Sequence, residues 1–156
     1  MTIQFIVSLI ATLSFAVLFS AQKSELIFCG LSGAIGWMVY IVCLDYHANA
    51  AIANLLATLT LTLFSRILSV LRRNPVTVYL LTGIFPLVPG AGIYYTSYYF
   101  IMGDMQQFSQ YASSTVKTAG SIVLGIIFGF AIPQSVFHGV SKLVHEKKKG
   151  DVKKLD

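Results

Sequence analysis

Residues 83–96 read GIFPLVPGAGIYYT, and this stretch decides how the chain folds. It lies inside an apolar segment of membrane-spanning length, Val76 to Met102. Proline removes a backbone N–H and collides with the preceding helical turn, so a helix that reaches Pro86 or Pro89 must kink or end. In hydrocarbon, the backbone groups released by such a break need partners in neighbouring protein or in a wet cavity. The stretch therefore predicts a broken membrane helix.

The composition is that of an integral membrane protein. Of 156 residues, 56% are hydrophobic and 11% are charged, and the mean hydropathy is +0.76. Soluble domains have about 25% charged residues, so this chain has too little charge to cover a water-facing surface. The net charge of +5 would favour a nucleic-acid partner in a soluble protein, but here the basic residues cluster at the ends of apolar segments and in the tail. We therefore expect contact with membrane lipids and none with nucleic acid.

Five stretches are long and apolar enough to cross a bilayer as helices, which takes about 20 mostly apolar residues. The predicted fold is all-α, a polytopic membrane protein whose fourth helix is broken between Pro86 and Gly90. A transmembrane domain covers residues 1–140, and residues 141–156 form a basic cytoplasmic tail. The predicted spans are Thr2 to Ala21, Leu26 to Leu44, Ala48 to Leu71, Val76 to Met102 and Thr118 to Phe137.

Lysine and arginine placement predicts the orientation, because these residues are enriched in cytoplasmic loops. When the tail is placed inside the cell and five spans are counted back from it, ten of the eleven basic residues lie on the cytoplasmic side, and Lys117 alone lies outside. We therefore expect a multi-pass protein of the plasma membrane, with the N-terminus outside and the C-terminus in the cytoplasm.

The predicted break offers a site for a carboxylate. At 1.5 Å per residue, Pro86 lies roughly 16 Å into its segment, near the middle of a hydrocarbon core of about 30 Å. A second half-helix begins near Gly90, and its free N–H groups and partial positive charge suit an anion. Glycines leave room for a ligand beside the backbone. The alternative is a kink that only shapes packing. The predicted substrate-binding residues of this segment are Pro86, Pro89, Gly90, Gly92, Tyr94 and Thr96.

The third predicted span has a polar face, because polar residues recur at every third or fourth position. This face either lines a polar path or supplies hydrogen bonds between helices, which are worth about 0.6 kcal/mol each in membranes. Asn54 and Thr58 are the two members that we include in the predicted substrate-binding site. The whole face is Asn54, Thr58, Thr62, Ser65 and Ser69.

Small residues form faces on the second and fifth predicted spans. Such faces let helices approach closely, so they contact either other helices of the chain or a partner subunit, a second copy included. No ionisable residue lies deep within spans one, two, four or five, so a proton relay would need a group from a partner. The small residues are Gly30, Gly33, Ala34 and Gly36 in the second span and Ser121, Gly125 and Gly129 in the fifth.

Enzyme motifs are absent from the sequence. It contains no GxSxG, no HExxH, no P-loop and no pair of carboxylates within one span. Cys29 and Cys43 lie too far apart along one helix to bond each other, and neither belongs to a zinc motif. We expect no catalytic activity, no cofactor and no metal.

The prolyl-glycine run resembles the threonine/serine exporter family, in its membrane half. The family pattern has a Pro, two aliphatic residues, a Pro and a Gly, followed by a Tyr, and here these are Pro86 to Gly90 and Tyr94. Two further stretches agree with the family, FSAQKSELIFCGLSGAIGW from Phe19 to Trp37 and RRNPVTVYLLTG from Arg72 to Gly83.

The resemblance implies a split transporter. The family occurs as one chain of about ten helices or as two subunits, and this chain is similar to the small subunit. It should therefore act with a larger subunit of the same family to export small amino acids, such as threonine and serine, or related small organic acids. The alternative function is a non-transporting membrane scaffold that stabilises a partner membrane protein.

Overall fold

A computed structural model describes residues 1–133, which contain helices and no strand. The predicted cytoplasmic tail, residues 141–156, lies outside the described residues. The elements in chain order are α1 (Thr2–Leu18), α2 (Leu26–Asp45), α3 (Ala50–Arg72), α4 (Val76–Ile84), the 3-10 turn η1 (Phe85–Leu87), α5 (Gly90–Met102) and α6 (Met105–Ala131).

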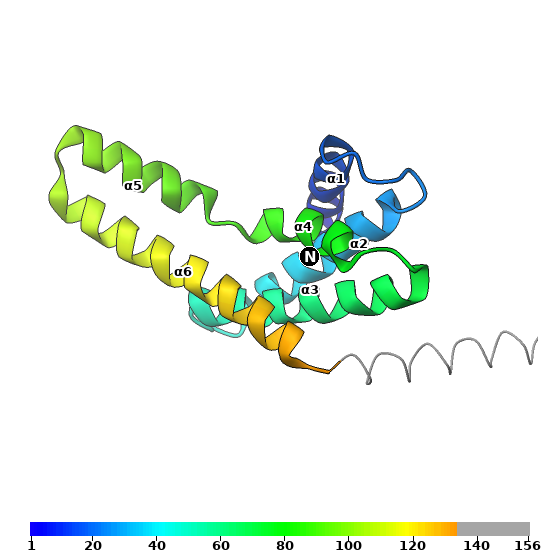
Figure 1. The fold of residues 1–156 in the computed structure, drawn as a ribbon. Helices are drawn as coiled ribbons and strands as arrows, with labels where there is room; N and C mark the ends of the chain where they lie inside the picture. Colours follow the sequence, from blue (N-terminus) through cyan, green and yellow to red (C-terminus); the bar gives the residue numbers. More distant parts are fainter. Residues whose placement is uncertain (134–156) are drawn as a thin grey trace, which may run out of the picture.

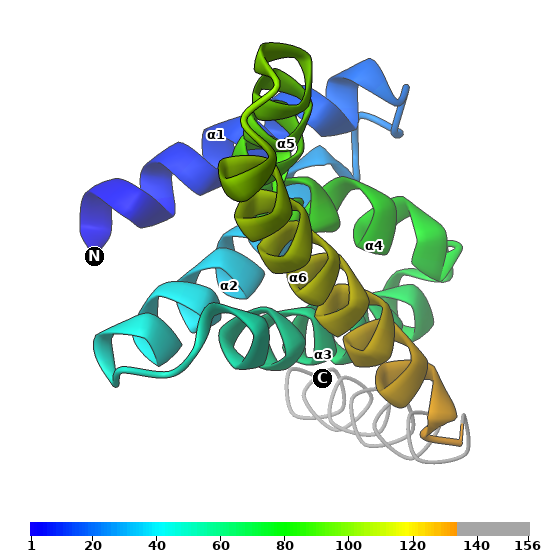
Figure 2. The same ribbon diagram turned by 90° about the vertical axis from the view of Figure 1, so that its left-hand side faces the viewer.

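The helices form a bundle and a projecting hairpin. Helices α1 to α4 pack together, and the second half of α6 lies against α3 (Figure 1). Helix α5 and the first half of α6 form an antiparallel hairpin that extends beyond the bundle. From the side of the hairpin, α6 runs across α3 (Figure 2). Helix α6 therefore joins the two parts, and the break between α4 and α5 lies where they meet.

Local sequence explains the ends of the longest packed helix, α3. Asn49 precedes it, and the Asn49 side chain accepts a hydrogen bond from the Ala51 N–H at 3.2 Å, which satisfies a free donor of the first turn. The helix ends at Arg72; the next residue, Arg73, has a left-handed φ of 57°, and the Ser69 hydroxyl donates to the Asn74 carbonyl at 2.6 Å. These interactions define where α3 begins and ends.

The small faces pack within the chain. A Cβ at Gly33 would lie 2.9 Å from the Cβ of Thr12 on α1. On α6, a Cβ at Gly125 would lie 2.8 Å from the Leu55 carbonyl oxygen, and one at Gly129 would lie 2.6 Å from the Cβ of Thr62. The glycines therefore bring α1 against α2 and α6 against α3, so of the two interpretations of these faces the structure supports packing within the chain.

The number of spans differs from the sequence-based count. Among the described residues, α2, α3 and α6 are long and apolar enough to cross a membrane, and the bent pair of α4–η1 with α5 adds a fourth if it forms one span. Helix α1 is apolar but has 17 residues, about 25 Å at 1.5 Å per residue. The prediction of five spans therefore stays a prediction.

The last helix begins before the predicted start of the fifth span. Helix α6 begins at Met105, not at Thr118. Asp104 caps it by accepting the Gln107 N–H at 3.1 Å, and the glutamine and serine residues that follow are compatible with a helix although they are polar. Hydropathy locates only the apolar part of such a helix. The helix ends at Ala131, and the predicted end at Phe137 lies outside the described residues.

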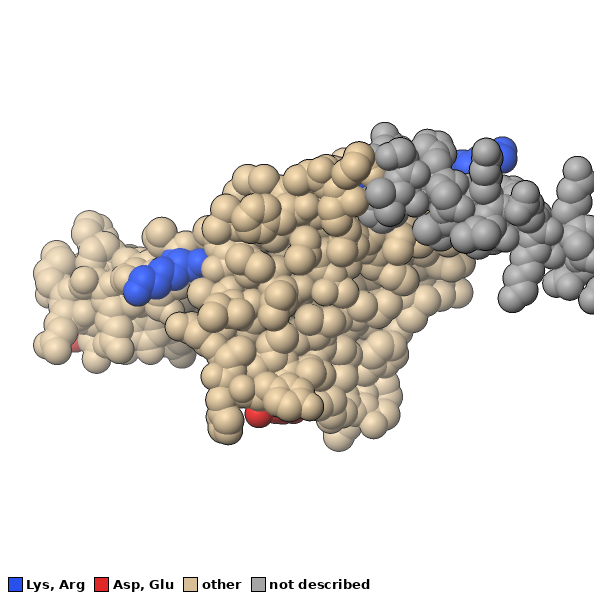
Figure 3. Space-filling model, turned by 90° about the horizontal axis from the view of Figure 1, so that it is seen from below, with Lys and Arg blue, Asp and Glu red and all other residues tan. Residues whose placement is uncertain are grey.

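The described surface is largely uncharged. Figure 3 shows few acidic or basic side chains on the face seen from below. Many large apolar side chains are exposed, among them Ile3, Ile27 and Ile101 at 77%, 68% and 80%. A surface of this kind suits lipid or protein contact, in agreement with the composition.

Candidate substrate-binding cavity

The helix break occurs at the two prolines. Helix α4 ends at Ile84, one 3-10 turn follows, and Val88 is extended with φ −62° and ψ 129°. A residue before proline is driven out of the helical region, which accounts for the extended Val88 before Pro89. Helix α5 then begins at Gly90, and the axis turns by 52° across the break. The helix is therefore interrupted between Ile84 and Gly90, at the prolines, and the prediction that its two halves form one broken membrane span stays a prediction.

A cavity of about 310 Å³ lies beside this break. Its volume is at the small end of the usual range for ligand pockets, about 300–1,000 Å³. One wall is the backbone from Pro86 to Gly92. The other walls come from α2, α3 and α6, and they contain Trp37 and Tyr40, Ala50 and Asn54, and Tyr111, Ser114, Thr115 and Thr118.

The N-terminus of α5 opens on this cavity. The Gly90 N–H donates to the Val88 carbonyl at 2.8 Å, and no side chain caps the helix. Within residues 1–133, the Ala91 and Gly92 amides have no acceptor outside the helix either. A Cβ at Gly90 would meet nothing within 4 Å. Free amides, the positive end of the helix dipole and open space together suit a carboxylate.

The structure brings together five of the eight predicted site residues. Pro86, Pro89, Gly90 and Gly92 border the cavity from the break, and Asn54 borders it from α3. Asn54 is 3% exposed, and its Nδ2 donates to the Ala50 carbonyl at 2.9 Å.

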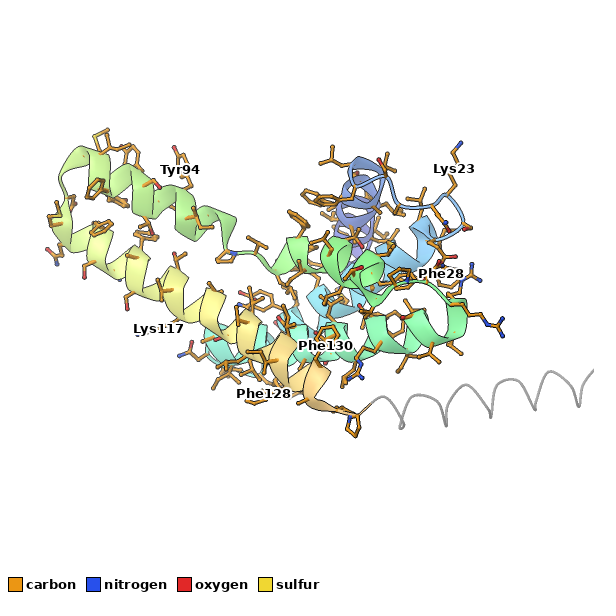
Figure 4. All side chains as sticks on the ribbon, in the orientation of Figure 1. Lys23, Phe28, Tyr94, Lys117, Phe128 and Phe130 are labelled. Atoms are coloured by element: carbon orange, nitrogen blue, oxygen red, sulfur yellow. The ribbon has the colours of Figure 1, made fainter. Side chains whose placement is uncertain are left out.

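The other three predicted residues lie elsewhere. Thr58 is fully buried against Gly125 of α6, and its hydroxyl donates to the Asn54 carbonyl at 2.7 Å. Tyr94 is 63% exposed and points away from α6 (Figure 4). The Thr96 hydroxyl donates to the Gly92 carbonyl at 2.7 Å. Each lies on a helix that reaches the cavity, but none of the three borders the cavity itself.

Sequence reasoning missed the wall formed by α6. Tyr111, Ser114, Thr115 and Thr118 recur at spacings of three, one and three, which places them on one helical face. The signal was present, but the predicted fifth span began at Thr118, so Tyr111, Ser114 and Thr115 were not assigned to a helix. The Thr115 hydroxyl is buried and has no hydrogen-bond partner in the described chain.

An ionic cluster around buried Glu25 holds the start of α4, which is the end of that helix away from the cavity. Glu25, the residue before α2, is 3% exposed. The Arg72 Nη2 donates to its Oε1 at 2.7 Å, and the Tyr79 hydroxyl donates to its Oε2 at 2.6 Å. The Arg72 hydrogen bond holds the pKa of Glu25 below its usual value, with help from Tyr79 and against the effect of burial. Arg72 also lies over the Phe28 ring, which is labelled in Figure 4.

Arg66 fixes the end of α6. Its Nη1 donates to the Gly129 carbonyl at 2.7 Å and to the Ile132 carbonyl at 2.6 Å. Its guanidinium also lies 5.6 Å from the centre of the Phe130 ring. A cation at a helix C-terminus satisfies carbonyls that lack partners in the helix. Arg66 is 9% exposed, so this cap on a neighbouring helix is buried.

One comparison with known proteins gives a match. A family model described as "Threonine/Serine exporter, ThrE" matches residues 4–132. None of the curated proteins and none of the solved structures matches the chain. The matched range begins within α1 and extends past the end of α6, so it includes every wall of the cavity.

Proposed function

This chain belongs to the threonine/serine exporter family, and we propose that it is the small membrane subunit of an exporter for small amino acids or related small organic acids. The chain is a membrane protein with no charged group on the walls of its candidate cavity. We propose that the substrate enters this cavity and places its carboxylate at the N-terminus of α5. The observation that supports this most directly is the coincidence of the cavity with the uncapped start of α5.

We propose five spans, with α1 as the first and with α4, η1 and α5 together as the broken fourth. In this arrangement the N-terminus is outside and the C-terminus is in the cytoplasm, and the depth of the cavity in the bilayer stays a prediction. The Lys and Arg bias supports this orientation. A reporter fused after Asp156 should be active only in the cytoplasm, and an external reporter would contradict the orientation.

A larger subunit of the same family is the proposed partner. Helix α5 has no buried residue and packs mainly against α6. Most of its remaining surface is apolar or aromatic, with Tyr94, Phe100 and Ile101 more than half exposed. The cavity therefore has one wall whose outer side is uncovered in this chain, as expected for half of a transporter.

The test is efflux from loaded cells that express this chain with its larger subunit. Gly90→Val should abolish most threonine or serine efflux, because its Cβ meets nothing within 4 Å and the added side chain takes up space beside the N-terminus of α5. Gly120→Val is the matched control, because Gly120 also has nothing within 4 Å but does not border the cavity. Membrane level and subunit association are measured for both variants.

The outcomes separate the two candidate functions. Loss of efflux in Gly90→Val alone, with normal assembly, supports the cavity as the substrate site. Full efflux from Gly90→Val would contradict it. If the larger subunit exports equally well without this chain but accumulates to a lower level, the chain is a scaffold that stabilises its partner.

A further inference from the structure

Three aromatic side chains border the cavity. Trp37 and Tyr40 lie one turn apart on α2, with ring centroids 5.3 Å apart and planes inclined by 36°. Tyr111 borders it from α6. The walls built from the described residues contain no Asp or Glu. An ammonium group in this cavity would therefore meet aromatic residues, hydroxyls and the Asn54 amide but no carboxylate, and the Tyr111 ring also packs against Tyr95 and Tyr99 of α5.

The structure fixes the position of the largest ring. The Trp37 Nε1 donates to the Gln4 Oε1 of α1 at 3.1 Å. An indole has one hydrogen-bond donor and no acceptor, so this bond uses its polar atom. What Trp37 offers to the cavity is therefore carbon and π surface. Gln4 is a positioning residue, because it acts on the cavity through Trp37.

We propose that Trp37, Tyr40 and Tyr111 recognise the ammonium group of the substrate, so that the cavity selects zwitterionic amino acids over organic acids. Aromatic faces carry negative charge density and attract a cation within about 6 Å of the ring centre. The same faces repel a second carboxylate, and the walls contain no Lys or Arg to bind one. This inference rests on the proposed function, because it takes the substrate carboxylate to lie at the N-terminus of α5.

The discriminating experiment compares three ligands. L-serine has both groups, glycerate has a hydroxyl in place of the ammonium, and ethanolamine lacks the carboxylate. The full-length chain in complex with its larger subunit, in lipid nanodiscs, is titrated with each, and displacement of labelled L-serine reports binding. L-serine should bind about tenfold more tightly than glycerate, the size expected of a partly desolvated cation–π contact. Ethanolamine should bind weakly, because it lacks the carboxylate.

Substitutions test whether the aromatic rings cause the preference for L-serine over glycerate. Binding of labelled L-serine, with glycerate as competitor, is measured for Trp37→Leu, Trp37→Phe and Gln4→Ala. Trp37→Leu should remove most of the preference for L-serine, Trp37→Phe should restore part of it, and Gln4→Ala should weaken it. Tyr94→Leu is the control, because Tyr94 does not border the cavity. If Trp37→Leu does not fold, Tyr40→Leu takes its place.

The outcomes distinguish this inference from the proposed function. Equal binding of L-serine and glycerate, both tighter than ethanolamine, would overturn ammonium recognition and leave the carboxylate site intact. An equal loss for both ligands in Trp37→Leu would also overturn it. Ethanolamine binding as tightly as L-serine would contradict the carboxylate site. Absence of binding by all three would overturn both proposals.

Discussion

Helices α4 and α5 come from one apolar segment, yet α4 buries Tyr79, Thr82 and Gly83, whereas α5 buries nothing. The difference follows from their neighbours. Helix α4 lies among α1, α2 and α3, whereas α5 packs mainly against α6. The cavity lies between a half-helix that the chain holds firmly and one whose outer face is uncovered. In a transporter such a pair can supply one fixed wall and one wall that depends on a partner subunit.

The largest expected difference between α4 and α5 is in how much a glycine-to-alanine substitution changes the free energy of unfolding. A Cβ at Gly83 would lie 2.6 Å from Leu61, 2.8 Å from Ser32 and 3.2 Å from the Gly33 backbone nitrogen, whereas one at Gly90 meets nothing. Gly83→Ala should therefore lower the free energy of unfolding by about 1–3 kcal/mol. Gly90→Ala should leave it unchanged or raise it by up to about 1 kcal/mol, because alanine favours a helix.

Reversible denaturant unfolding in detergent measures both changes. Gly120→Ala on α6 controls for the helix propensity of alanine at an open position. Equal destabilisation by Gly83→Ala and Gly90→Ala would show that the two halves are packed alike, contrary to the structure.

A smaller difference is expected from the tyrosine hydroxyls of the two halves. The Tyr79 hydroxyl donates to buried Glu25 at 2.6 Å, and a hydrogen bond to a charged group contributes about 1.5–3 kcal/mol. Tyr79→Phe should lower the free energy of unfolding by about 1.5 kcal/mol, since Glu25 keeps Arg72 as a partner. Tyr98→Phe on α5 is the matched control and should change it little, because Tyr98 is 40% exposed.

The pH dependence of the Tyr79→Phe effect tests whether the effect arises from the hydrogen bond to Glu25. Because Arg72 and Tyr79 lower the pKa of Glu25, the cluster stabilises the fold fully above the unfolded pKa of a glutamate, about 4.3. Its contribution is lost as the pH falls from there through the folded pKa. The Tyr79→Phe effect should therefore be constant near neutral pH and should shrink below about pH 4. An effect that stays unchanged in acid would place its origin elsewhere.

The broken helix was predictable because its signal is local. Two prolines three residues apart cannot continue a helix, whatever surrounds them. The family resemblance was predictable for the same reason, since it depends on the same contiguous residues, and the match over residues 4–132 confirms it. Asn54 borders the cavity, and helical periodicity alone places it on the same face as the other polar residues of α3.

The rest of the cavity depends on contacts between distant segments. Trp37 and Tyr40 fit an interfacial aromatic belt by sequence alone, and their position beside Gly90 follows only from the packing of α2 against α4 and η1. Glu25 precedes an apolar segment and has the pattern of a loop residue. Its burial depends on Arg72, which is 47 residues away. Hydropathy ranks residues by type, so it misses a polar residue that is buried with its partner.

The smallest expected effect concerns a close contact between the start of α5 and α6. A Cβ at Gly92 would overlap the Thr115 Oγ1 and lie 3.4 Å from its Cβ. Gly92→Ala should therefore lower the free energy of unfolding by about 1 kcal/mol. In a Thr115→Ala background the clash is absent, so Gly92→Ala should then cost almost nothing. Thr115→Ala alone should be nearly neutral, because its buried hydroxyl has no partner in the described chain.

The double-mutant cycle measures the coupling, with Thr118→Ala in place of Thr115→Ala as the control. Thr118 borders the cavity, but it is not among the atoms nearest to Gly92. We expect a coupling of about 0.5–1 kcal/mol with Thr115 and none with Thr118. Strict additivity in both cycles would mean that α5 does not approach α6 at this point. The contrast between a fixed α4 and a loosely attached α5 would then extend to the first turn of α5, and the cavity would need the partner subunit to define its shape.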